Sequence, residues 1–116
     1  IQEGRSRKGD VIGVARVAGI LAAKKTSEII PLCHPIFISS VDIEFEFFGN
    51  GRPSQSGIDI TATIKSVGKS GLEMEAMLAA SVAGLTVYDM AKAVDKGMRM
   101  EEVRLISKTG GKGPDF

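Results

Sequence analysis

The chain has 116 residues, of which 43% are hydrophobic and 25% are charged, and its formal net charge is +1. This length predicts a single domain over residues 1–116, and so small a charge gives little field for gathering nucleic acid. The only cysteine is Cys33, and no apolar run reaches the length of a transmembrane helix. We therefore expect a cytoplasmic protein without a disulfide, a cysteine-rich zinc site, a nucleic-acid partner or a membrane partner.

The first predicted element is a helix over residues 11–23. Asp10 precedes it and is expected to cap it, and Arg16 is its only charge. A helix this apolar should be covered on most of its sides. Thr26 is then expected to cap a short turn that stops before Pro31.

A hairpin of two strands is predicted next. It follows residues 31–35, an irregular connection with a proline at each end. Apolar and acidic residues alternate over 41–47, and apolar and mostly polar residues alternate over 58–64. With turn residues between them, these segments are typical of two antiparallel strands.

The last predicted elements are a long helix near residues 74–96, ended by Gly97, and a third strand near Val103 and Leu105. The order is helix, strand, strand, helix, strand. One more strand at the start would complete the β-α-β-β-α-β ferredoxin-like pattern, and because the chain begins at Ile1 we expect a preceding stretch to supply it. The predicted fold is α+β, with an antiparallel sheet packed against two main helices.

Asp89 and Lys92 are the first candidates for chemistry. They share one face of the predicted helix, and charges inside an apolar helix are costly unless they are paired or functional. One interpretation is a structural salt bridge. The other is an acid–base lysine whose proton affinity is set by Asp89 and by burial.

Three further side chains are candidates for a polar pocket. Glu73 and Glu75 would face the same way on an extended segment, whereas on a helix they would point roughly 200° apart and act as an N-terminal capping pair. His34 is the only histidine and lies between two prolines, which suits the fixed orientation that proton transfer needs. A lone histidine is nevertheless most often a packing or surface residue.

Basic residues beside glycines recur along the chain, at Lys8, Lys69, Lys108 and Lys112. Glycines let backbone N–H groups approach an anion, and lysines neutralise its charge, so this pattern favours a polyphosphate ligand. A charged tail is the alternative for the last two. None of these segments is a Walker loop, because the earlier glycine is absent.

Together these segments resemble a known family. The motifs, in chain order, are Lys8-Gly9-Asp10, Leu32-Cys33-His34-Pro35, Glu73-Met74-Glu75-Ala76, Tyr88-Asp89-Met90 with Lys92, and Lys108-Thr109-Gly110-Gly111-Lys112. At these spacings the chain resembles, from end to end, the cyclic pyranopterin monophosphate synthases, the MoaC family of molybdenum cofactor (molybdopterin) biosynthesis. The resemblance implies a ferredoxin-like fold, in agreement with the element order.

The resemblance also implies an activity and an assembly. The family is a lyase that takes cyclised dihydroguanosine triphosphate from an upstream radical enzyme. It converts this substrate to cyclic pyranopterin monophosphate and releases pyrophosphate. Its members are homo-hexamers, trimers of dimers, with the active site at a subunit interface.

Residue roles follow from the resemblance. Lys8 and Lys92 would transfer protons, with Asp89 orienting or tuning Lys92. His34, Glu73 and Glu75 would line the pterin end of the pocket, with His34 also counted as catalytic. Cys33 and Met74 are counted as further substrate-binding residues. Lys108 would lie near the triphosphate, and we add Arg16 and Lys112 as further phosphate contacts. No metal site and no certain cofactor is implied, and whether Mg²⁺ accompanies the triphosphate stays open.

Two non-enzymatic classes are the alternatives. Ferredoxin-like sheets can bind RNA by stacking bases on exposed aromatic residues. Here Phe45 and Phe47 alternate with acids, so if the phenylalanines face the core, the exposed face is acidic and repels RNA. A small regulatory ligand-binding domain would not need charges inside a buried helix. We therefore expect an enzyme.

Overall fold

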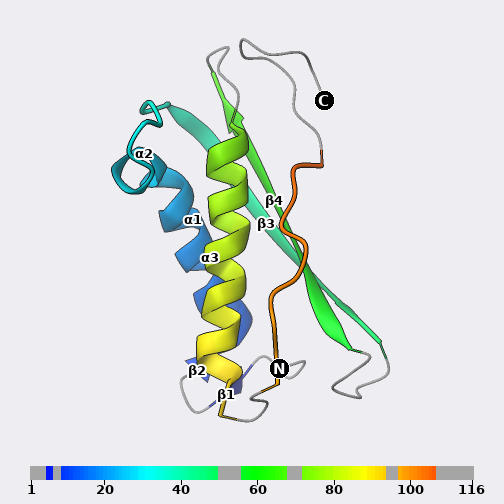
Figure 1. Cartoon of the computed structure of the whole chain (residues 1–116). Helices are drawn as coiled ribbons and strands as arrows, with labels where there is room; N and C mark the ends of the chain where they lie inside the picture. Colours follow the sequence, from blue (N-terminus) through cyan, green and yellow to red (C-terminus); the bar gives the residue numbers. More distant parts are fainter. Residues whose placement is uncertain (1–4, 7–8, 50–55, 68–71, 94–96, 107–116) are drawn as a thin grey trace.

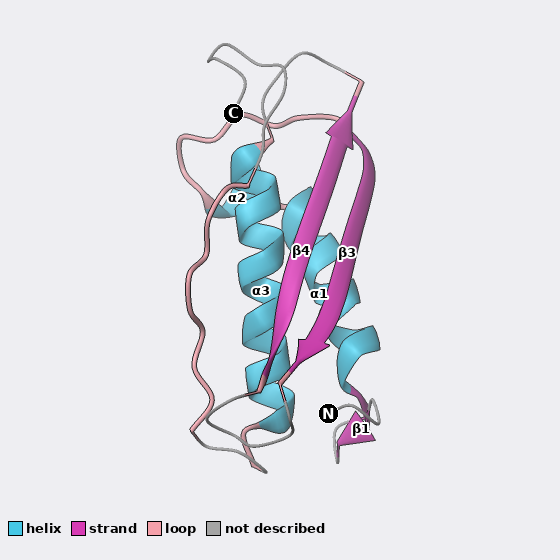
Figure 2. Cartoon of the chain, turned by 90° about the vertical axis from the view of Figure 1, so that its right-hand side faces the viewer, coloured by secondary structure: helices cyan, strands magenta, loops and turns pink. Residues whose placement is uncertain are grey.

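A computed structural model describes residues 5–6, 9–49, 56–67, 72–93 and 97–106. Its elements, in chain order, are β1 (Arg5–Ser6), β2 (Gly9–Asp10), α1 (Val11–Lys24), α2 (Thr26–Ile29), β3 (Ile38–Phe48), β4 (Gly57–Ser66) and α3 (Glu73–Ala91). β1 pairs with β2, and β3 pairs with β4, both antiparallel. The helices α1 and α3 run in opposite directions and cover one face of the β3–β4 hairpin (Figures 1 and 2). The predicted α+β class is confirmed.

The β3–β4 hairpin has the register that its alternating sequence predicts. Ile43 faces Ala62, and Phe45 faces Ile60, with one irregularity between Ile38 and Ser40. The apolar residues pack toward the helices, and Ile43 is fully buried. The other face of β3 is acidic, because its exposed side chains include Asp42, Glu44 and Glu46. This acidic face argues against RNA binding at the sheet.

The start of α1 is as predicted, and its end is not. The Oδ1 atom of Asp10 accepts a hydrogen bond from the backbone N–H of Gly13 at 3.1 Å, so Asp10 is the N-cap. Thr26 was expected to cap the following turn, but its hydroxyl donates to the carbonyls of Ala22 and Ala23 at 2.9 and 3.1 Å. Thr26 therefore satisfies the last carbonyl groups of α1 and does not cap α2.

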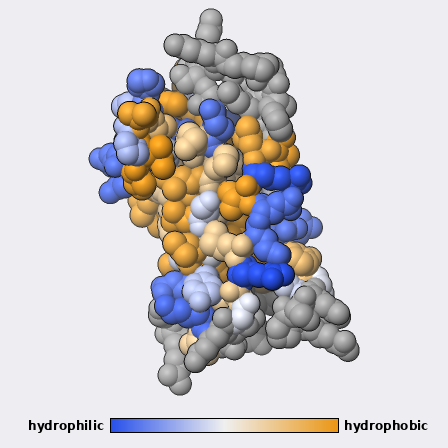
Figure 3. Space-filling view, in the orientation of Figure 1, coloured by the Kyte–Doolittle hydropathy of each residue, from blue (hydrophilic) through white to orange (hydrophobic). Residues whose placement is uncertain are grey.

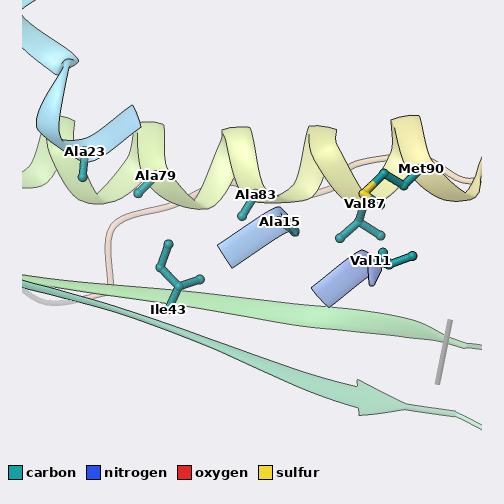
Figure 4. Close-up of a cluster of buried hydrophobic side chains, with 8 residues drawn as sticks. All are labelled: Val11, Ala15, Ala23, Ile43, Ala79, Ala83, Val87 and Met90. Carbon is teal, nitrogen blue, oxygen red and sulfur yellow. The ribbon is translucent and has the colours of Figure 1, made fainter. Parts of the chain in front are cut away.

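Small residues hold α1 and α3 close together (Figure 4). The buried cluster consists of Val11, Ala15, Ala23, Ile43, Ala79, Ala83, Val87 and Met90. At the helix contact, a Cβ atom on Gly19 would collide with the Ile43 side chain and lie 3.0 Å from the carbonyl oxygen of Ala79. The close approach of the two helices therefore requires a glycine at position 19. None of the described helices has the length and apolar character needed to cross a membrane.

The predicted third strand near Val103 and Leu105 is absent from the described part of the segment, residues 97–106. This segment runs back along α3 (Figures 1 and 2), and Met100 packs over Gly84 of that helix. In a split βαβ unit, the two strands joined by the helix have another strand between them. No such strand lies beside β4 among the described residues. Residues 97–106 therefore have no neighbouring strand with which to form backbone hydrogen bonds.

Candidate functional site

The first part of the candidate site lies where the connection between α2 and β3 meets the start of α3. The backbone N–H of Cys33 donates to the carbonyl of Ile30 at 3.1 Å, which holds this connection in a turn. The Cys33 thiol donates to the Oε2 atom of Glu75 at 3.8 Å. Glu75 is only 3% exposed, so its carboxylate lies in the protein interior beside the thiol. A carboxylate in such a position needs polar partners, and Cys33 is one of them.

The state of the Cys33 thiol follows from these neighbours. Burial raises the pKa of Cys33, and so do the charge of Glu75, its hydrogen bond and the charge of Glu73. The thiol therefore stays protonated well above neutral pH and acts as a hydrogen-bond donor. This environment is the opposite of the electropositive surroundings that activate a nucleophilic cysteine.

The backbone of Glu73 and Glu75 is helical and not extended, which settles the two alternatives that the sequence left open. Glu73 and Glu75 both lie in the first turn of α3, where the helix dipole favours acids, so the extended segment is not observed. Burial hides the Oε2 atom of Glu73 as well as the Glu75 side chain. Both carboxylates act on Cys33, so two glutamates of a helical segment can influence the same thiol. Met74, between them, is exposed.

His34 follows Cys33 directly, and its side chain is exposed. Its carbonyl oxygen accepts a second contact from the Cys33 thiol, at 3.8 Å. The imidazole therefore lies at the surface and not in the core. We call Cys33, His34, Glu73, Met74 and Glu75 the Glu75 half-site.

The second part of the candidate site lies at the opposite end of α3. The Nζ atom of Lys92 is 3.2 Å from the Oδ1 atom of Asp89, one helical turn away. The helix ends at Ala91, with Lys92 as its C-cap, whereas the sequence predicted a helix to residue 96. The two side chains are 51% and 56% exposed, which corrects the expectation of charges inside a buried helix. We call Asp89 and Lys92 the Lys92 half-site.

This exposure changes what the Asp89–Lys92 pair can do. An exposed ion pair contributes little to stability, so the pair is not explained as a structural support of the core. The geometry shows an exposed lysine whose Nζ atom is held 3.2 Å from the carboxylate of Asp89.

The two half-sites do not meet within one chain. At 1.5 Å per residue, Glu75 and Lys92 lie about 25 Å apart along α3. In Figure 1 the start of α3 lies beside α2 and its end lies beside β1 and β2. No side chain can bridge about 25 Å. A single chain therefore carries two separate groups of candidate residues.

Arg16 belongs to neither half-site. Its Nε atom donates to the main-chain carbonyl of Ile43 at 3.1 Å, and its guanidinium group lies 5.2 Å from the centre of the Phe45 ring. The hollow beside it is also lined by Glu44, Glu46 and Asp59. These carboxylates oppose an anion, so the predicted phosphate contact of Arg16 finds no support in its surroundings.

The remaining predicted site residues, Lys8, Lys108 and Lys112, lie outside the described residues. In the part of the chain that is described, no group of three or more histidine, cysteine, aspartate or glutamate residues could hold a metal ion. The contact that sequence reasoning missed is that between Cys33 and Glu75. Both residues were candidates, but they are distant in the chain and nothing in a single sequence links them.

Comparisons with known proteins identify the family of the chain. The chain matches the model of the MoaC family over residues 1–111. Proteins named cyclic pyranopterin monophosphate synthase are similar to it along its whole length of 116 residues. They come from Peptoclostridium acidaminophilum (55% identical, 70% of the relative covered), Listeria welshimeri (54%, 69%) and Desulforamulus reducens (54%, 68%). The chain belongs to the MoaC family.

Proposed function

We propose that this chain is a cyclic pyranopterin monophosphate synthase that acts in molybdenum cofactor biosynthesis. As a lyase, it converts cyclised dihydroguanosine triphosphate, the product of a radical enzyme, to cyclic pyranopterin monophosphate and pyrophosphate. The main support for this proposal is that the chain is similar, over its whole length, to proteins named cyclic pyranopterin monophosphate synthase. We place residues 1–116 in one domain and the protein in the cytoplasm.

The reaction explains why one site needs several ionisable groups. Opening and reclosing a guanine-derived ring requires protons to be delivered and removed at several atoms, which suits a set of acids and bases. We assign proton transfer to Lys92, with Asp89 holding its Nζ atom at 3.2 Å, and to Lys8. Departure of pyrophosphate requires positive charge on the leaving group, which we assign to Lys108 and Lys112.

The Glu75 half-site suits the ring end of the substrate. A guanine-derived ring presents adjacent N–H donors, and Glu73 and Glu75 would offer carboxylate oxygens that are shielded from water. Hydrogen bonds from N–H groups to a carboxylate are among the stronger ones available in a protein. His34 is exposed beside Cys33, where it can exchange protons with a bound ring. In this proposal Cys33 positions Glu75 and is not a nucleophile.

We further propose that two copies of the chain complete each site. The Glu75 half-site of one copy would meet the Lys92 half-site of another, within a homo-hexamer arranged as a trimer of dimers. The supporting observation is the separation of about 25 Å between the half-sites along α3. Residues this far apart cannot act on the same atoms of one substrate within one chain.

Product analysis tests the proposed reaction. The full-length protein is supplied with cyclised dihydroguanosine triphosphate, and cyclic pyranopterin and pyrophosphate are quantified. We expect both products from the wild type and from Lys65→Ala, an exposed lysine of β4, and neither from Lys92→Ala. A wild type that binds the nucleotide and leaves it unchanged would refute the enzyme and favour a binding domain.

A further inference from the structure

Glu75 carries a buried carboxylate that is contacted from a different part of the chain. Its side chain is 3% exposed and belongs to the first turn of α3. The Oε2 atom accepts a hydrogen bond at 3.8 Å from the thiol of Cys33, which lies in the connection between α2 and β3. A glutamate side chain has several rotatable bonds, so a contact at its end limits the orientations that the carboxylate can adopt.

Cys33 is in turn tied to the end of α1 by a series of hydrogen bonds. The hydroxyl of Thr26 donates to the carbonyl of Ala22 at 2.9 Å. The backbone N–H of Ile30 donates to the carbonyl of Thr26 at 2.8 Å, and the backbone N–H of Cys33 donates to the carbonyl of Ile30 at 3.1 Å. The thiol therefore connects a backbone segment anchored on α1 to a carboxylate of α3.

The large apolar side chains of the connection do not anchor it in the core. Leu32 is 93% exposed and Phe37 is 78% exposed. Apolar side chains are visible at the surface over α2, at the upper left of Figure 3. Among the contacts of the described residues, the thiol of Cys33 is therefore the one that relates this connection to Glu75.

We propose that Cys33 is a positioning residue, whose thiol holds the carboxylate of Glu75 in the direction that the substrate ring requires and does not itself touch the substrate. This inference rests on the proposed function, in which Glu75 accepts hydrogen bonds from that ring. It replaces the direct substrate contact that the sequence predicted for Cys33.

A thiol has the right chemistry for this task. It is an uncharged and weak donor, so it orients the carboxylate without neutralising the negative charge that the ring is to meet. An apolar side chain in its place would remove a donor from a carboxylate in the protein interior. The second acceptor of the thiol, the carbonyl of His34 at 3.8 Å, lies on its own segment and leaves Glu75 free to bind a ligand.

The first test observes the contact without any substrate. Cys33 is the only cysteine of the chain, so the S–H stretching band in the infrared spectrum reports on this thiol alone. In Glu75→Ala the band should move to higher frequency, because the remaining acceptor is uncharged and binds the S–H group more weakly. Glu28→Ala, an exposed change in α2, should leave the band in place. An identical band in Glu75→Ala and in the wild type overturns the proposal.

The second test separates positioning from direct contact by the kinetics of the proposed reaction. Cys33→Ala should lower kcat by about tenfold or more, because a misplaced reacting group is costly. A direct contact with the substrate would instead raise KM and leave kcat unchanged, and that result overturns the proposal. Cys33→Ser keeps a donor and should recover most of the wild-type kcat, whereas a serine variant as slow as the alanine variant also contradicts the positioning role.

Two controls complete the kinetic test. Cys33→Val fills the space of the thiol without a donor, so it should show the loss of Cys33→Ala if the hydrogen bond matters, and wild-type kcat if only the cavity matters. The wild type itself reports on the proposed function, which fails if no cyclic pyranopterin monophosphate is formed. An active wild type together with equally active Cys33→Ala and Cys33→Val variants refutes the positioning role alone.

Discussion

The thiol of Cys33 donates to the buried carboxylate of Glu75 across 3.8 Å, and this contact joins the connection before β3 to the first turn of α3. Burial and the two nearby carboxylates raise the pKa of the thiol. Cys33 is therefore a hydrogen-bond donor to the Glu75 carboxylate, and its surroundings are not those of an activated nucleophile.

The Cys33 contact predicts how the thiol reacts with alkylating agents. In Glu75→Gln the carboxylate charge is gone, so the pKa of Cys33 should fall toward its ordinary value and more thiolate should be present at a given pH. The rate of iodoacetamide modification, followed against pH, should then rise at lower pH than in the wild type. Glu28→Gln, an exposed change in α2, should leave the profile in place. Coincident profiles for Glu75→Gln and wild type would contradict the contact.

Gly19 should be intolerant of any side chain. In Gly19→Ala the new methyl group meets the Ile43 side chain and the carbonyl oxygen of Ala79. Alanine is the better helix former by about 1 kcal/mol, but overpacking of this kind costs about 1–3 kcal/mol. We expect a net loss of about 1 kcal/mol in the free energy of unfolding, measured with urea. Lys24→Ala, an exposed change in the same helix, should alter the free energy of unfolding by less than about 0.5 kcal/mol. A Gly19→Ala protein that is more stable than the wild type would show that the two helices can move apart.

Thr26 should contribute through its hydroxyl group. The side chain is 2% exposed and donates to the carbonyls of Ala22 and Ala23. Thr26→Val keeps the shape and removes the donor, so the free energy of unfolding should fall by about 1–2 kcal/mol. In Thr26→Ser the donor remains, and the loss should be limited to that of one buried methyl group. Equal losses for valine and serine would mean that packing alone explains the position.

Local patterns predicted the parts of the fold that depend on neighbours in the chain. The alternation over residues 41–47 is enough to place β3, and Asp10 before an apolar run is enough to start α1. Features that depend on distant segments were not predictable in this way. Thr26 bonds backward to α1 because that helix ends just before it. The strand expected near Val103 has no neighbouring strand among the described residues.

The candidate site shows the same limit. Motifs identified Cys33, Glu75, Asp89 and Lys92 one by one, but their grouping is a property of the folded chain. The helix predicted near residues 74–96 already contained Glu75 and Lys92, so their spacing along it could have separated the half-sites in advance. Helix α1 was expected to be covered on most of its sides, but Val14, Val17 and Leu21 are exposed on its outer face.

The central claim, a synthase whose site is shared between copies, is tested most directly by mixing two inactive variants. Glu75→Gln and Lys92→Ala chains with different affinity tags are produced together, assemblies carrying both tags are purified, and formation of cyclic pyranopterin monophosphate is measured. A shared site regains about one quarter of wild-type activity, because one of four random pairings combines an intact Glu75 half-site with an intact Lys92 half-site. If the mixed assemblies are as inactive as the two variants alone, each site lies within one chain and the account is wrong.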